Sequence, residues 1–130
     1  MNLHNFELPD DSKIEIIDNR SFDRSSIERL LIPPNVTKIC ECAFSYCKKL
    51  KKIAIHHYSK LKFIDHRAFE GSSIESINIP FSVEHIGFRV FDDCDNLLII
   101  EFENYDMFYA IDESEFISHP KTLFMISLDD

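Results

Sequence analysis

Apolar residues recur at a fixed set of positions along the chain. Five phenylalanines form one column, at spacings of 22, 25, 22 and 25 residues: Phe22, Phe44, Phe69, Phe91 and Phe116. Five residues before each phenylalanine stands an isoleucine, and this second column is Ile17, Ile39, Ile64, Ile86 and Ile111. When residues 14–55 are laid on residues 61–102, 16 of the 42 paired positions are identical, which indicates a duplication. Units of this length cannot bury a core alone, so the pattern predicts a stack of repeats.

A short segment of alternating apolar positions follows each of the first four phenylalanines. These segments are residues 30–32, 53–55, 77–79 and 100–102. A period of two predicts strands with one face inward, and one strand per coil builds a parallel sheet along a solenoid. Pro33 and Pro80 end their strands, because proline has no N–H to give to the ladder. A second extended piece (residues 36–39 and 83–86) and a helix-like turn then complete the coil, so we expect a single β-rich solenoid of five to six coils over residues 1–130.

Two further columns have a structural explanation. Asp18, Asp65 and Asp112 follow the column isoleucines, and we expect their carboxylates to cap the turn by accepting from backbone N–H groups two or three residues on. Cys47 and Cys94 occupy the same position two coils apart, about 10 Å at the usual strand spacing. A disulfide needs Cα atoms within about 7 Å, so we expect buried free thiols.

The strings ICECAFSYCKKLKKIAI, IDHRAFEGSSIESINIPFSVEHIG and RVFDDCDNLLIIEF resemble the BspA-type leucine-rich repeat, in register over about residues 6–126. The family glycine is kept only at Gly87. The resemblance implies a right-handed leucine-rich-repeat-like coil, with a parallel sheet on one face and short helical or 3-10 turns. The family is similar to surface antigens of bacteria and parasitic protists. It therefore implies an extracellular, adhesive role with host or matrix proteins as partners and no catalytic residues.

Composition and segment lengths bear on location. The longest apolar runs, residues 97–100 and 107–111, are far shorter than the roughly 20 residues of a membrane span. The first residues contain no basic region followed by an apolar one, so the sequence predicts no signal peptide. The family resemblance favours the cell surface, whereas this N-terminal sequence favours a cytoplasmic interaction scaffold, and both alternatives stay open.

The charge is acidic and unevenly distributed. The formal net charge is −9, with a balance of +2 over residues 1–65 and −11 over residues 66–130. Nucleic acids and anionic membranes both reward a basic surface, so neither is expected as a general partner.

No catalytic or metal site is predicted. Cys40 and Cys42 with His66 of the next coil could form a zinc site, but the Cys-x-Cys spacing is unusual and no second tight pair follows. Gly71 and Gly87 are the only glycines, so a phosphate-binding glycine loop is excluded. We therefore expect no cofactor and no enzymatic activity.

The predicted binding surface is the outward face of the strands. By alternation, its residues are Arg29, Leu31, Lys52, Ala54, Ser76, Asn78, Ile99 and Glu101. Stacked in register they form one ribbon, the kind of surface through which solenoids commonly bind. The repeat columns also reach Phe6 and Leu8 at one end and Phe124 and Ile126 at the other. This predicts uncapped ends, belonging to a longer array or associating weakly with other copies.

Overall fold

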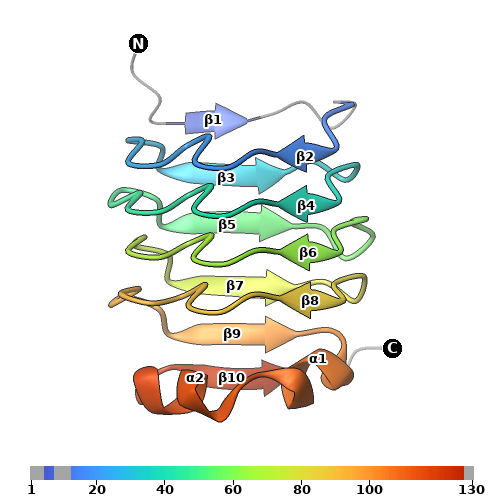
Figure 1. The fold of residues 1–130 in the computed structure, drawn as a ribbon, viewed down its shortest axis with the longest axis vertical. Helices are drawn as coiled ribbons and strands as arrows, with labels where there is room; N and C mark the ends of the chain where they lie inside the picture. The colour runs from blue at the N-terminus through green and yellow to red at the C-terminus, as the bar shows by residue number, and fades with distance from the viewer. Residues whose placement is uncertain (1–4, 8–12, 128–130) are drawn as a thin grey trace.

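The computed structural model of the chain describes residues 5–7 and 13–127, and it contains two parallel sheets (Figure 1). In spatial order the six-stranded sheet consists of β1 (Asn5–Glu7), β3 (Arg29–Ile32), β5 (Lys52–Ile55), β7 (Ser76–Ile79), β9 (Ile99–Phe102) and β10 (Leu123–Ile126). The four-stranded sheet consists of β2 (Ile16–Ile17), β4 (Lys38–Ile39), β6 (Phe63–Ile64) and β8 (His85–Ile86). Figure 1 shows the strands of the two sheets running in opposite directions, as expected when each coil crosses from one sheet to the other.

Successive coils are stacked in register. Leu30 pairs with Ile53, and Ile77 pairs with Ile100, so like positions of the repeat lie side by side. Strands β3, β7 and β9 alternate between buried and more exposed residues. The predicted solenoid, with one long strand per coil and its apolar face inward, is therefore confirmed.

The phenylalanine column forms a ladder of stacked rings through the core. Ring centroids are 5.2 Å apart for Phe22 and Phe44, 5.4 Å for Phe44 and Phe69, and 6.2 Å for Phe69 and Phe91. The planes of adjacent rings differ by no more than 8°. Each such pair contributes about 0.5–1.5 kcal/mol beyond the burial of its area. The column thus links four consecutive coils.

The backbone of the phenylalanine turns also forms a ladder. The N–H of Phe22 donates to the carbonyl of Ala43, and the N–H of Phe44 donates to that of Ala68, both at 2.8 Å. The residues two before and two after each phenylalanine have positive φ, namely Arg20, Arg24, Cys42, Tyr46, Arg67, Gly71, Arg89 and Asp93. These left-handed residues point alternate N–H groups along the solenoid, so that each turn bonds to the next.

The cysteine prediction is confirmed in the turns, and the aspartate prediction is confirmed at one of its three positions. Cys47 and Cys94 are free, buried thiols. They donate to the carbonyls of Phe22 and Phe69 at 3.0 and 3.1 Å, and burial raises the pKa of each thiol to about 11. The carboxylates of Asp18 and Asp65 accept from the backbone N–H of the very next residue, both at 2.8 Å, which differs from the expected donor two or three residues on. Asp112 accepts from the N–H of Ser114, two residues on, as expected.

The last coil departs from the repeat. It contains two short helices, α1 (Tyr105–Ala110) and α2 (Glu113–Ser118), beside β10 (Figure 1). The side chains of Asn104 and Asp112 accept from backbone N–H groups at the first turns of α1 and α2. Bonds from the backbone and hydroxyl of Ser114 lower the pKa of the Asp112 carboxyl. Phe116 consequently lies on α2 against Phe124, at 4.5 Å between ring centroids, rather than on the Phe91 ring.

Candidate binding surface

The predicted ribbon lies on one face of the six-stranded sheet, in two columns. The first column joins β3, β5, β7 and β9 through the pairs Arg29 with Lys52, Lys52 with Ser76, and Ser76 with Ile99. In the second column Leu31 pairs with Ala54, and Asn78 pairs with Glu101. All eight side chains are at least partly exposed. The structure therefore places the predicted residues together on one continuous surface.

A groove of about 490 Å³ opens on this surface across β3, β5 and β7. It is lined by Arg29, Leu30, Leu31, Lys51, Lys52, Ile53, Ala54, Glu75 and Ser76. Regular pairing between β5 and β7 is limited to Lys52 and Ser76, whereas β3 and β5 pair over four residues. Ile53 is consequently half-exposed on a sheet whose equivalent residues Leu30 and Ile77 are buried.

The chemistry of the groove combines positive charge and an apolar floor. Arg29, Lys51 and Lys52 provide three cations, and Glu75 provides one carboxylate. Leu31 and Ala54 pair across β3 and β5 and form an apolar surface in the same groove. The cationic side chains of the groove would attract an acidic side chain of a partner, and Leu31 and Ala54 would contact an apolar side chain next to it.

The other end of the same face is apolar and was only partly anticipated. Leu98, Leu123 and Met125 are exposed, and Leu123 pairs with Ile99. The ribbon expected from the sequence contains Ile99 but neither Leu123 nor Met125. The alternating segment Leu123–Ile126 carried a usable signal, because the same period of two defines the other strands.

Among the described residues, Cys40, Cys42 and His66 do not gather into a group of possible metal ligands. The ring of His66 stacks on Phe88 at 3.8 Å between centroids, and His66 Nδ1 accepts from the backbone N–H of Phe88 at 2.9 Å. Gly87 allows this approach, because a β-carbon there would lie only 2.6 Å from the backbone nitrogen of His66. Burial raises the pKa of the Cys40 thiol, which disfavours the thiolate that zinc needs. His66 therefore fastens neighbouring coils together.

Within residues 5–7 and 13–127, neither helix is long or apolar enough to cross a membrane. Leu8, which the sequence pattern assigned to the first repeat, lies outside the described residues.

Three solved structures resemble the chain. A leucine-rich repeat protein from Bacteroides capillosus ATCC 29799 is 23% identical over 75% of both chains, with a TM-score of 0.66. The pneumococcal vaccine antigen PcpA is 35% identical with a TM-score of 0.69, and the match covers 71% of this chain and 23% of the antigen. A leucine rich cell surface protein from Faecalibacterium prausnitzii A2-165 is 31% identical with a TM-score of 0.55, over 60% of this chain and 20% of that protein.

A comparison with curated proteins gives no match. The sequence pattern described as the BspA type leucine rich repeat region matches residues 1–127 in six copies. These matches support a repeat domain of the protein-interaction class, whose family is generally non-catalytic. The pattern spans nearly the whole sequence and the observed coils follow its repeats, so the chain belongs to the BspA-type leucine-rich repeat family.

Proposed function

We propose that the chain is an adhesive domain that binds a host or matrix protein at a cell surface through the outward face of its six-stranded sheet. The groove over β3, β5 and β7 carries this proposal, since it joins three cations to an apolar floor at the residues of the ribbon. A protein segment with an acidic residue beside an apolar one fits that surface. The charges orient the segment, and apolar surface on both partners is removed from water on contact.

Two of the similar structures support a surface location. One is named a vaccine antigen and the other a cell surface protein, and each is more than 30% identical to this chain over the matched part. The chain spans about a quarter or less of those two proteins, so what it shares with them is a stretch of repeats.

Protease accessibility on intact source cells tests the location. An antibody against the chain would report cleavage by externally added protease, with a cytoplasmic protein followed as the control for lysis. We expect cleavage without lysis. Protection until the cells are opened would contradict adhesion and would favour an intracellular interaction scaffold of the same fold.

Binding to purified matrix glycoproteins tests the activity. The chain is immobilised, and each protein of the panel is passed over it at physiological salt and again at high salt. We expect saturable binding of at least one protein, weakened by salt because cations line the groove. The absence of saturable binding from the whole panel would contradict a matrix-binding role.

A further inference from the structure

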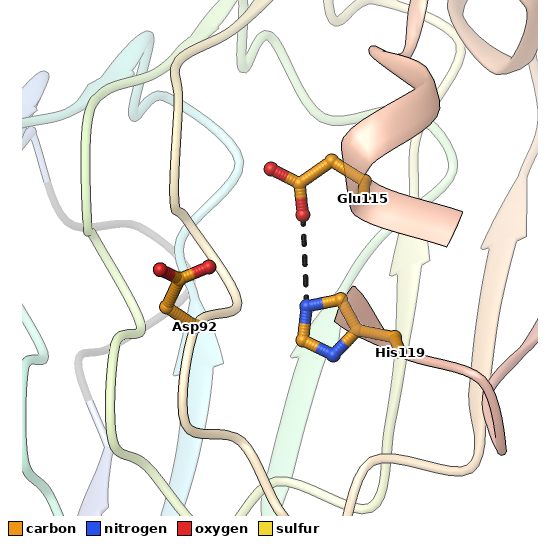
Figure 2. A group of neighbouring side chains, drawn as sticks. All are labelled: Asp92, Glu115 and His119. Atoms are coloured by element: carbon orange, nitrogen blue, oxygen red, sulfur yellow. Dashed lines mark ion pairs between the residues drawn. The ribbon is translucent and has the colours of Figure 1, made fainter. Parts of the chain in front are cut away.

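Three metal-ligating side chains meet outside the binding surface. Glu115 lies in α2, and His119, four residues later, is the residue that caps the C-terminal end of that helix. Asp92 belongs to the phenylalanine turn of the preceding coil, and Figure 2 shows its carboxylate beside the other two side chains. One carboxylate oxygen of each acid and one imidazole nitrogen lie within 4.8 Å of one another.

Two polar atoms of this cluster, on Glu115 and His119, are buried and have no hydrogen-bond partner among the described residues. The His119 side chain is only 7% exposed, and neither its Nε2 nor Glu115 Oε2 has a hydrogen-bond partner. These two atoms are 3.6 Å apart, too far for a hydrogen bond. Burying such groups without partners is unfavourable, and two nearby carboxylates also repel each other. The Asp92 carboxylate has one cation nearby, because Arg89 Nε lies 4.0 Å from its Oδ2, whereas the buried atoms of Glu115 and His119 face each other without a hydrogen bond.

We propose that Asp92, Glu115 and His119 bind one Zn²⁺ ion. Two ligands on a tetrahedral zinc ion lie about 3.3–3.6 Å apart when the metal–ligand distances are about 2.0–2.2 Å. The separation between His119 Nε2 and Glu115 Oε2 has this value. An imidazole with two carboxylates is a normal donor set for zinc, whereas Mg²⁺ and Ca²⁺ prefer sites made of oxygen alone.

The surroundings of the cluster fit an accessible metal site. A cavity of about 820 Å³ lies between the last regular coil and the two helices, and both Asp92 and Glu115 line it. An ion can enter through this cavity, and water from it can complete the coordination. The backbone of Asp92 is already fixed, since its carbonyl accepts from the N–H of Gly71 at 2.8 Å. Zinc would therefore fasten α2 to a rigid turn and stabilise the last coil.

The experiment is a calorimetric titration of ZnCl₂ into the untagged, chelator-treated full chain. We expect one ion per chain and a higher unfolding temperature with zinc. Asp92→Asn, Glu115→Gln and His119→Ala should each weaken binding more than roughly 100-fold. His57→Ala, which removes an exposed histidine elsewhere, should bind as the parent does. Asp92→Asn keeps the backbone bonds of its turn, so it remains informative if His119→Ala does not fold.

Cobalt distinguishes this site from the thiols. Co²⁺ bound by nitrogen and oxygen gives visible bands without thiolate-to-cobalt charge transfer, and this is the spectrum we expect. A charge-transfer band would place the metal on a cysteine and overturn the proposal. So would the absence of saturable zinc binding, which would leave the pair of Glu115 and His119 as a structural contact only. Unchanged binding in all three ligand variants would overturn it as well.

Discussion

The aromatic ring of Tyr46 lies over Gly71 of the following coil and leaves no room for a β-carbon there. Gly71 also has a φ of +72°, in the left-handed region that residues with side chains adopt only at a cost. Residues with side chains adopt the same region at equivalent turn positions, among them Arg24 and Asp93, so it is the Tyr46 ring that requires glycine here. The position shows how closely the turns of successive coils are packed.

Replacement of Gly71 by alanine should therefore destabilise the chain by about 1–3 kcal/mol, from the clash and the backbone strain together. Urea unfolding followed by circular dichroism measures the change. In a Tyr46→Ala background the same replacement should cost less, because only the backbone strain remains. Equal costs in the two backgrounds would show that the ring does not constrain Gly71.

The ring ladder and the departing fifth phenylalanine make a matched pair. Phe69 is fully buried between Phe44 and Phe91, whereas Phe116 on α2 is 38% exposed. We expect Phe69→Ala to cost about 3–5 kcal/mol and Phe116→Ala to cost clearly less, both from urea unfolding. Similar losses at the two positions would mean that Phe116 belongs to the core ladder after all.

The buried thiols predict a pH dependence at alkaline pH. Burial raises the pKa of Cys47 and Cys94 from 9.0 to about 11, so the folded chain retains protons that the unfolded chain releases. This contribution to stability is complete below pH 9 and is lost as the pH rises towards 11. Cys94→Ala should therefore reduce the slope of the unfolding free energy against pH in that range. An unchanged slope would contradict the raised pKa.

The end of the six-stranded sheet predicts weak self-association. Among the described residues, strand β10 pairs with β9 alone, and its outward residues Leu123 and Met125 are 61% and 42% exposed. Sedimentation velocity should show an apparent mass that rises with concentration. Leu123→Lys should suppress the rise, since lysine on an edge strand blocks pairing. Ile117→Lys on α2, 78% exposed, is the control that should leave it unchanged, and a monomer at all concentrations would contradict the prediction.

Most of the fold could be predicted because it repeats. A period of two marks β3, β7 and β9 directly, and a column shared by four coils marks the ring ladder. The departure of the last coil could not be predicted from the repeat, because Phe116 keeps the column spacing although it lies in a helix. Asn104 and Asp112 cap those helices, and both are residue types favoured at helix N-caps, so the sequence does carry a local signal for them.

The ribbon residues could be predicted from the sequence, whereas the groove and the group of Asp92, Glu115 and His119 could not. Alternation gave the ribbon residues, because every strand contributes in the same register. It could not give the groove, since Ile53 and Ile77 look equivalent in sequence although the pairing of β5 and β7 is irregular. Asp92 is separated from Glu115 and His119 by a whole coil, and only α2 brings them together.

Two charge reversals test whether the outward face of the six-stranded sheet binds the partner protein. Lys52→Glu lies in the groove, and Lys62→Glu makes the same change before β6, outside it. Affinity for a matrix protein that binds the parent chain is measured for both variants at low and physiological salt. The account predicts that Lys52→Glu weakens binding at least about tenfold while Lys62→Glu leaves it near the parent value. Equal effects of the two variants, or no effect of Lys52→Glu, would contradict it.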